Sequence, residues 1–100
     1  MIKQIAIERQ YDNAWKEEEI LLEEEGSFTL KEALSIIEKG LKTHFKQNSF
    51  DFTNASKGGW PDNQVKLVHC YGPENRGKMA CVYITGDKKD VQKLVKGMTE

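Results

Sequence analysis

The chain has 100 residues, of which 38% are hydrophobic and 31% are charged, a composition typical of a globular domain rather than of a disordered or fibrous chain. No apolar run approaches the roughly 18 residues of a membrane span, and the N-terminal segment lacks the basic start and apolar centre of a signal peptide. We therefore expect one globular domain over residues 1–100, located in the cytoplasm and not in a membrane.

The net charge of -1 hides an asymmetry along the chain. Residues 1–38 contain four Lys and Arg against ten Asp and Glu, whereas residues 39–100 contain eleven basic and six acidic side chains. Such an asymmetry affects the choice of partner and the rate of association more than it affects the fold.

The first segment, MIKQIAIER, predicts a strand because Ile5 and Ile7 stand at strand spacing. A helix is the alternative, since Ile2, Ile5 and Ala6 would share one helical face.

The second segment, YDNAWKEEEILLEEEG, contains two glutamate triplets around three apolar residues. Asp12 or Asn13 can cap a helix, glutamates suit its first turn, and Gly26 can end it. Because Glu, Leu and Ala are strong helix formers, we predict a helix over residues 13–25.

A strand remains the alternative for this segment, with Ile20 and Leu22 facing inward. Residues 2–24 would then form a hairpin that precedes the next helix, in the order of a ubiquitin-like grasp.

The third segment has a clear helix start. Thr29 and Glu32 have the spacing of a capping box, in which each side chain accepts a hydrogen bond from the backbone of the other residue. The apolar residues that follow recur at intervals of three and four, which predicts an amphipathic helix over residues 30–46. They are Leu30, Ala33, Leu34, Ile37, Leu41 and Phe45.

The rest of the chain predicts mainly strands. Phe50 to Phe52 suggest a short strand before a long polar loop, and VKLVHCY and MACVYIT suggest a hairpin joined by GPENRGK. Asp87 can cap a final helix, KKDVQKLVKGM. The order predicts an α+β domain, with an antiparallel sheet of about three to four strands and two or three helices on one face.

The hairpin has consequences for the two cysteines. If ENRG forms a symmetrical turn, Cys70 lies opposite Cys81, at a distance that a disulfide can bridge. His69 would point to the opposite face, because neighbouring strand residues alternate. In a reducing compartment both cysteines are expected as thiols that pack as small apolar side chains. We therefore predict no metal and no cofactor.

No catalytic motif stands out. The sequence contains no G-x-S-x-G, H-E-x-x-H or Walker-type pattern, and adjacent exposed glutamates do not provide the separated pKa values of an acid and base pair. We therefore do not expect an enzyme.

The leading hypothesis is a small regulatory or protein-interaction domain with an acidic docking surface. Unpaired carboxylates at one end of a charge-polarised domain would attract a basic protein, for example a nucleic-acid-handling partner. The proposed surface consists of Glu17, Glu18, Glu19, Glu23, Glu24 and Glu25.

The alternative hypothesis places function in the basic second half. Lysine and arginine side chains would contact nucleic-acid phosphates, while a tryptophan would stack on a base. The candidate residues are Lys57, Trp60, Arg76, Lys78, Lys88 and Lys89.

Overall fold

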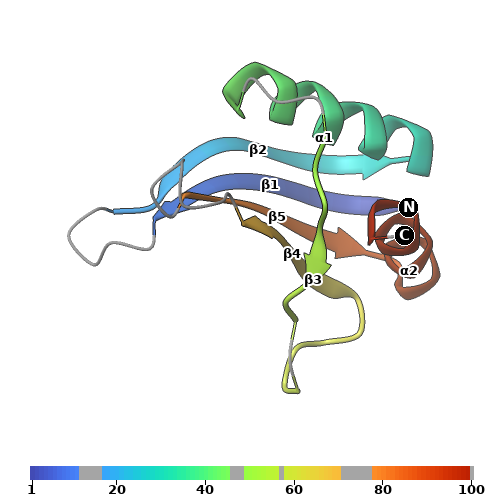
Figure 1. The fold of residues 1–100 in the computed structure, drawn as a ribbon. Helices are drawn as coiled ribbons and strands as arrows, with labels where there is room; N and C mark the ends of the chain where they lie inside the picture. Colours follow the sequence, from blue (N-terminus) through green and yellow to red (C-terminus); the bar gives the residue numbers. More distant parts are fainter. Residues whose placement is uncertain (12–16, 46–48, 57, 71–77, 100) are drawn as a thin grey trace.

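The computed structural model describes residues 1–11, 17–45, 49–56, 58–70 and 78–99. Figure 1 shows how strands and helices follow one another in these ranges. The elements are β1 (Ile2–Tyr11), β2 (Glu19–Phe28), α1 (Leu30–Phe45), β3 (Thr53–Asn54), β4 (Gln64–Cys70), β5 (Lys78–Gly86) and α2 (Lys88–Thr99).

The five strands form one antiparallel sheet in the order β2-β1-β5-β4-β3. The predicted α+β class and antiparallel sheet are confirmed, although the sheet has five strands rather than three to four. Both helices pack on the same face of the sheet. The core between them contains Ile5, Ile7, Leu67, Val82 and Ile84 from the strands and Ala33, Ile37, Leu41, Val91 and Leu94 from the helices. Neither helix in the described ranges is long and apolar enough to cross a membrane.

The structure of the second segment differs from the helix that its sequence predicted. Residues 19–28 form a strand, so a helix over residues 13–25 is wrong wherever the chain is described; residues 12–16 lie outside that part. Leu22 faces Ile7 of β1 and packs against the core. Helix propensities differ by only about 0.7 kcal/mol per residue, whereas burying a large apolar side chain stabilises by about 1.5 to 3 kcal/mol. Pairing with β1 therefore prevails, and the alternative hairpin is confirmed. Its prediction that Ile20 faces inward is wrong, because a register shift between Ile7 and Glu8 places Ile20 opposite Glu8, where it is exposed.

Helix α1 begins as predicted. The Thr29 N–H donates to Glu32 Oε1 at 3.0 Å, and the Glu32 N–H donates to Thr29 Oγ1 at 3.1 Å. Hydrogen bonding of the Glu32 carboxyl by Thr29, first from its backbone N–H and then from its hydroxyl, holds the pKa of Glu32 below its usual value. Ala33, Ile37 and Leu41 are buried against the sheet. Local sequence signals therefore define this helix.

The segment after α1 differs from the prediction. The short strand is Thr53–Asn54 rather than Phe50 to Phe52. The Phe50 and Phe52 rings stack with their centroids 5.8 Å apart, and the His69 ring contacts Phe50 edge-on at 5.2 Å. The Asp51 N–H also donates to His69 Nδ1 at 3.0 Å. Packing of these rings, rather than strand pairing, therefore organises residues 50–52.

The hairpin of β4 and β5 is confirmed, but its predicted register is wrong by two residues. Cys70 faces Met79, and Val68 faces Cys81. A shift of two residues leaves every side chain on its original face, because side chains alternate with a period of two. Hydrophobic alternation therefore could not reveal the error. The turn residues on which the prediction relied, 71–77, lie outside the described residues.

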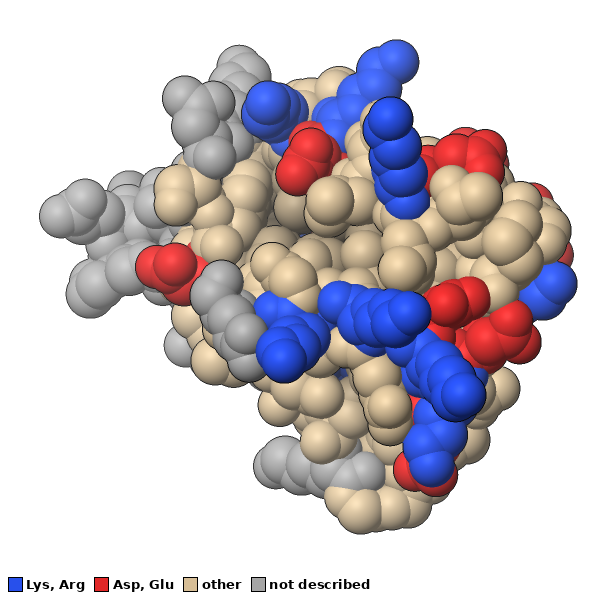
Figure 2. All heavy atoms as spheres, turned by 90° about the vertical axis from the view of Figure 1, so that its right-hand side faces the viewer, with Lys and Arg blue, Asp and Glu red and all other residues tan. Residues whose placement is uncertain are grey.

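The final helix is also confirmed. Its first turn closes when the Val91 N–H donates to the Asp87 carbonyl at 2.9 Å, and Val91 and Leu94 are buried. Figure 2 views the molecule from the side that carries α2 and shows lysine and arginine side chains above and below a hollow.

Candidate functional site

The sheet face turned away from α1 and α2, here called the open face, carries the side chains that alternate with the core residues. The strand register arranges these side chains in rows that cross from β2 through β1 and β5 to β4. The three central rows are Glu25, Gln4, Thr85 and Gln64; Glu23, Ala6, Tyr83 and Lys66; and Ile20, Glu8, Cys81 and Val68.

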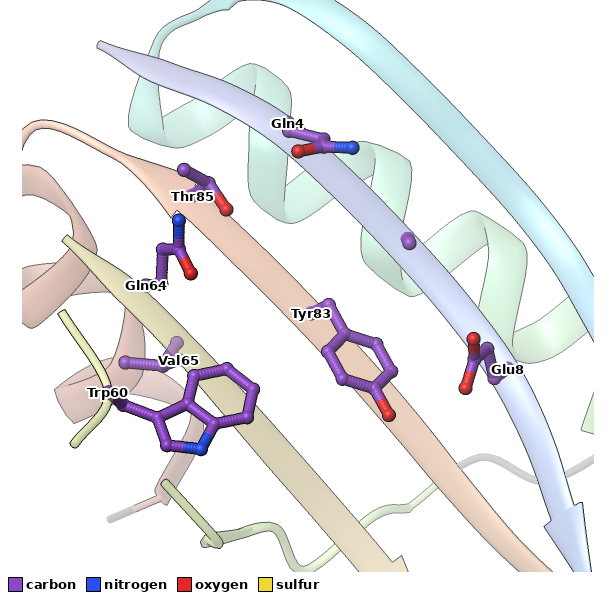
Figure 3. A pocket seen from close by; sticks show the side chains of 8 residues that line it. Gln4, Glu8, Trp60, Gln64, Val65, Tyr83 and Thr85 are labelled. Carbon is purple, nitrogen blue, oxygen red and sulfur yellow. The ribbon is translucent and has the colours of Figure 1, made fainter. Parts of the chain in front are cut away.

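A hollow of about 290 Å³ lies on the open face, where the small side chain of Ala6 stands beside Tyr83. Trp60, from the loop before β4, reaches over this face, and Figure 3 shows its ring beside the Tyr83 ring. The two ring planes differ by 18°, and their centroids are 6.5 Å apart. The Trp60 side chain is still 38% exposed. Glu8, Gln4, Gln64 and Thr85 supply polar groups around these rings.

Polar contacts fix the position of Tyr83. Gln10 Nε2 donates to the Tyr83 hydroxyl and to Glu8 Oε2, both at 3.0 Å. Lys66 Nζ lies 5.6 Å from the centroid of the Tyr83 ring and 3.5 Å from Gln10 Oε1. Burial raises the pKa of Tyr83, so its hydroxyl remains neutral at physiological pH. Burial also acts to lower the pKa of Lys66, but its interactions with Tyr83, Cys81 and Glu8 outweigh burial and raise it.

This geometry is suited to binding a cation rather than an anion. Aromatic faces attract cations, and a carboxylate such as Glu8 accepts charge-assisted hydrogen bonds. The amides of Gln4 and Gln64 can both donate and accept. Within the chain, the ammonium group of Lys66 already lies over the Tyr83 ring in this way.

The six glutamates of the predicted acidic surface do not share one face. Glu23 and Glu25 lie on the open face, and Glu25 Oε1 accepts a hydrogen bond from Gln4 Nε2 at 3.4 Å. Glu24 faces Ile5 and so belongs to the opposite face, although it is exposed. The two residues that precede β2, Glu17 and Glu18, are exposed.

The sixth member, Glu19, is engaged inside the chain. It forms an ion pair with Arg9 at 3.0 Å and accepts a hydrogen bond from the Tyr11 hydroxyl at 2.7 Å. Arg9 also donates to the His44 carbonyl at 2.7 Å and lies over the Phe45 ring. Glu19 therefore helps to join β2, β1 and the end of α1. These internal contacts explain its position without a role in binding a partner.

The candidate nucleic-acid-binding residues are spread over different parts of the molecule. Trp60 belongs to the open face, whereas Lys88 and Lys89 begin α2 and Lys78 begins β5. Lys88 Nζ forms an ion pair with Asp62 at 3.3 Å. The remaining two candidates, Lys57 and Arg76, lie outside the residues that the structure describes.

No family model, curated protein or solved structure matches this chain. Within the open-face site, sequence reasoning missed Gln4, Glu8 and Tyr83. The signal was present in part, because Gln4 and Glu8 alternate with the core residues of β1 and Tyr83 does so in β5. Alternation could not show that these strands are neighbours, which is what brings the three side chains together.

The cysteines are separated by their environments. Cys70 is exposed, whereas Cys81 is completely buried. Burial raises the pKa of the Cys81 thiol to about 11, which keeps it protonated at neutral pH. His69 points to the opposite face, as predicted, and packs against Phe50 and Phe52. The described residues contain no group of three or more His, Cys, Asp or Glu side chains placed to hold a metal ion.

Thiol labelling should separate the two cysteines. At pH 8 only about one in a thousand Cys81 thiols would be ionised at a pKa of about 11, and burial blocks access to the sulfur. We expect Cys70 to react with a disulfide reagent at least about 100-fold faster than Cys81 in the folded protein. Absorbance after mixing with 5,5'-dithiobis(2-nitrobenzoate) measures both rates. Cys70→Ser should remove the fast phase, and Cys81→Ala should retain it; the reverse assignment would contradict the burial of Cys81.

Proposed function

We propose that this protein is a non-enzymatic interaction protein that binds an arginine-containing basic segment of a partner on the open face of its sheet. One observation carries the proposal: Glu8, Glu23 and Glu25 share this face with the exposed ring of Trp60 beside Tyr83. Proteins that bind nucleic acids are rich in arginine and lysine where they meet phosphates, and a protein of this kind is the partner we propose.

The charges on the open face support a cationic ligand. Its three central rows contain the carboxylates of Glu8, Glu23 and Glu25 but only one ammonium group, that of Lys66. Carboxylates arranged in this way accelerate the approach of a basic segment and repel a polyanion.

Arginine fits the site better than lysine does. A guanidinium is planar, stacks on aromatic rings and donates two parallel hydrogen bonds to a carboxylate. Trp60 offers a partly exposed ring, and Glu8 lines the same hollow. Lysine lacks both the planar shape and the paired donors.

Nucleic-acid binding is the second candidate, and the exposed ring of Trp60 is the observation that favours it. A single-stranded base can stack on such a ring with little regard to sequence. The same face carries three carboxylates, however, which would repel the phosphates of the bound strand. We therefore rank this candidate second.

A fluorescence-anisotropy titration tests the proposal. The probes are fluorescein-labelled arginine, lysine and glutamate peptides of equal length, together with single- and double-stranded RNA and DNA. We expect the arginine peptide to bind best and to weaken as salt rises. Glu23→Gln with Glu25→Gln should weaken it about threefold to tenfold, because each exposed charge pair contributes about 0.2 to 1 kcal/mol.

The matched control is Glu24→Gln with Glu38→Gln, which removes the same charge from exposed residues off the open face. This control should leave the affinity within about twofold of the parent value. Equal weakening by both double variants would attribute binding to net charge and reject the open face as the site. Preferential binding of RNA or DNA would instead favour the second candidate.

A further inference from the structure

A second surface lies on the helical side of the molecule, between α1 and α2. One hollow of about 310 Å³ is lined mainly by Leu30, Leu34, Leu94 and Gly97. A second hollow of about 300 Å³ also includes Leu34 and Gly97 and continues toward the Phe50 and Phe52 rings. Because the two hollows share Leu34 and Gly97, they form one continuous groove, here called the inter-helix groove; its first hollow has an apolar floor, and Glu38 lines the second.

The rim of the first hollow is basic. Lys31 of α1 and Lys93 of α2 line the first hollow, and Lys89 and Lys96 flank Lys93 along α2. Figure 2 shows basic side chains on both sides of the hollow. Within the described ranges, these four lysines form no ion pair, in contrast to Lys88 with Asp62. Their charges therefore face solvent beside an apolar floor.

We propose that the inter-helix groove binds an acidic amphipathic helix of a partner protein. Such a helix places apolar side chains at intervals of three and four in a groove while its polar face remains at the rim. Acidic residues on that face would meet Lys31 and Lys93, and leucine-sized side chains would contact Leu30, Leu34 and Leu94. We choose this ligand because its acidic face would complement the lysines and its apolar face would match the floor of the groove.

Gly97 leaves room for this ligand. A side-chain carbon added there would meet no atom within 4 Å, so the backbone of α2 is open to the groove. Leu34 is 38% exposed and lines both hollows. A nucleic acid would gain little from this apolar floor, because its affinity comes mainly from phosphate contacts. The site is also separate from the open face and has the opposite charge, so one can fail without the other.

The probe is a fluorescein-labelled amphipathic peptide of about 18 residues, or five helical turns, with a leucine stripe and glutamates elsewhere. We expect saturable, salt-sensitive binding by anisotropy. Gly97→Phe should fill the groove and weaken binding at least about tenfold, whereas Gly97→Ala should stay within about twofold. Lys31→Gln with Lys93→Gln should weaken binding about threefold to tenfold and reduce its salt dependence. Circular dichroism checks that each variant is folded.

Leu34→Glu provides an independent test if Gly97→Phe fails to fold, because it places a carboxylate in the groove at an exposed position. It should also weaken the peptide at least about tenfold. Glu23→Gln with Glu25→Gln should have no effect, which separates this site from the open face. No saturation, equal binding of a peptide with lysines in place of the glutamates, or full binding by Leu34→Glu would overturn the proposal.

Discussion

Gly86→Ala is expected to lower the free energy of unfolding by about 1 to 3 kcal/mol, the usual cost of overfilling a packed site. An added side-chain carbon would lie 2.6 Å from the Met1 carbonyl oxygen and 2.8 Å from the Ile2 Cα. Both are backbone atoms, so no side-chain rotation can relieve the overlap. The Gly86 N–H also donates to the Asn63 carbonyl at 3.0 Å, which restricts movement of β5 away from β1. The change therefore strains the pairing of the two central strands.

Gly97→Ala is the matched control, because the same methyl group there meets no atom within 4 Å. Gly97 lies inside α2, where alanine is favoured over glycine by about 0.8 to 1 kcal/mol. Urea denaturation followed by circular dichroism should therefore show opposite shifts of the midpoint for the two variants. Equal stability of Gly86→Ala and the parent would mean that the first residues of β1 shift to make room for the methyl group at little cost in free energy.

The parts of the fold that were predicted correctly depend on local signals. The capping box at Thr29 and Glu32 and the apolar stripe after it lie within a few turns of one another, and α1 begins and packs as they indicate. The segment containing Leu22 has strong helix propensity, but its pairing with Ile7 across the hairpin decides its structure. Propensity cannot anticipate this, because the stabilising contact belongs to another strand.

The candidate site shows the same limit. Alternation in β1 identifies Gln4 and Glu8 as residues that face away from the core, but their partners on β5, Thr85 and Cys81, lie 81 and 73 residues later in the chain. Trp60 was predicted as a stacking residue, but the predicted hairpin did not show that the loop before β4 would bring Trp60 beside Tyr83 of β5. Sequence patterns therefore predicted which face of a strand each side chain occupies, but not which side chains from other strands lie beside it.

The position of β2 also gives the glutamates a physical role that needs no partner. As the first strand in the sheet order, it has a single neighbour among the described strands, so its outer edge presents backbone groups that no described strand pairs. It has ten residues and includes Ile20, which is 61% exposed. Such an edge can pair with the same edge of a second molecule unless charges prevent it. Glu23, Glu24 and Glu25 would bring like charges together in that pairing.

Replacing Glu23, Glu24 and Glu25 with threonine should therefore cause self-association. Threonine favours strands, so the variant keeps β2 while it removes the repulsion. We expect the variant to form dimers or larger aggregates at concentrations at which the parent protein elutes as a smaller species. Size-exclusion chromatography with light scattering measures the mass of both.

The control replaces Glu17, Glu18 and Glu38 with threonine, which removes the same charge from exposed residues outside β2. If both triple variants associate equally, net charge rather than edge protection keeps the molecules apart. If only the β2 variant associates, then Glu23 and Glu25 protect the edge as well as facing the proposed ligand. Since a bound basic segment would neutralise these carboxylates, it should then promote pairing of two β2 edges, and light scattering during the arginine-peptide titration would detect the increase in mass.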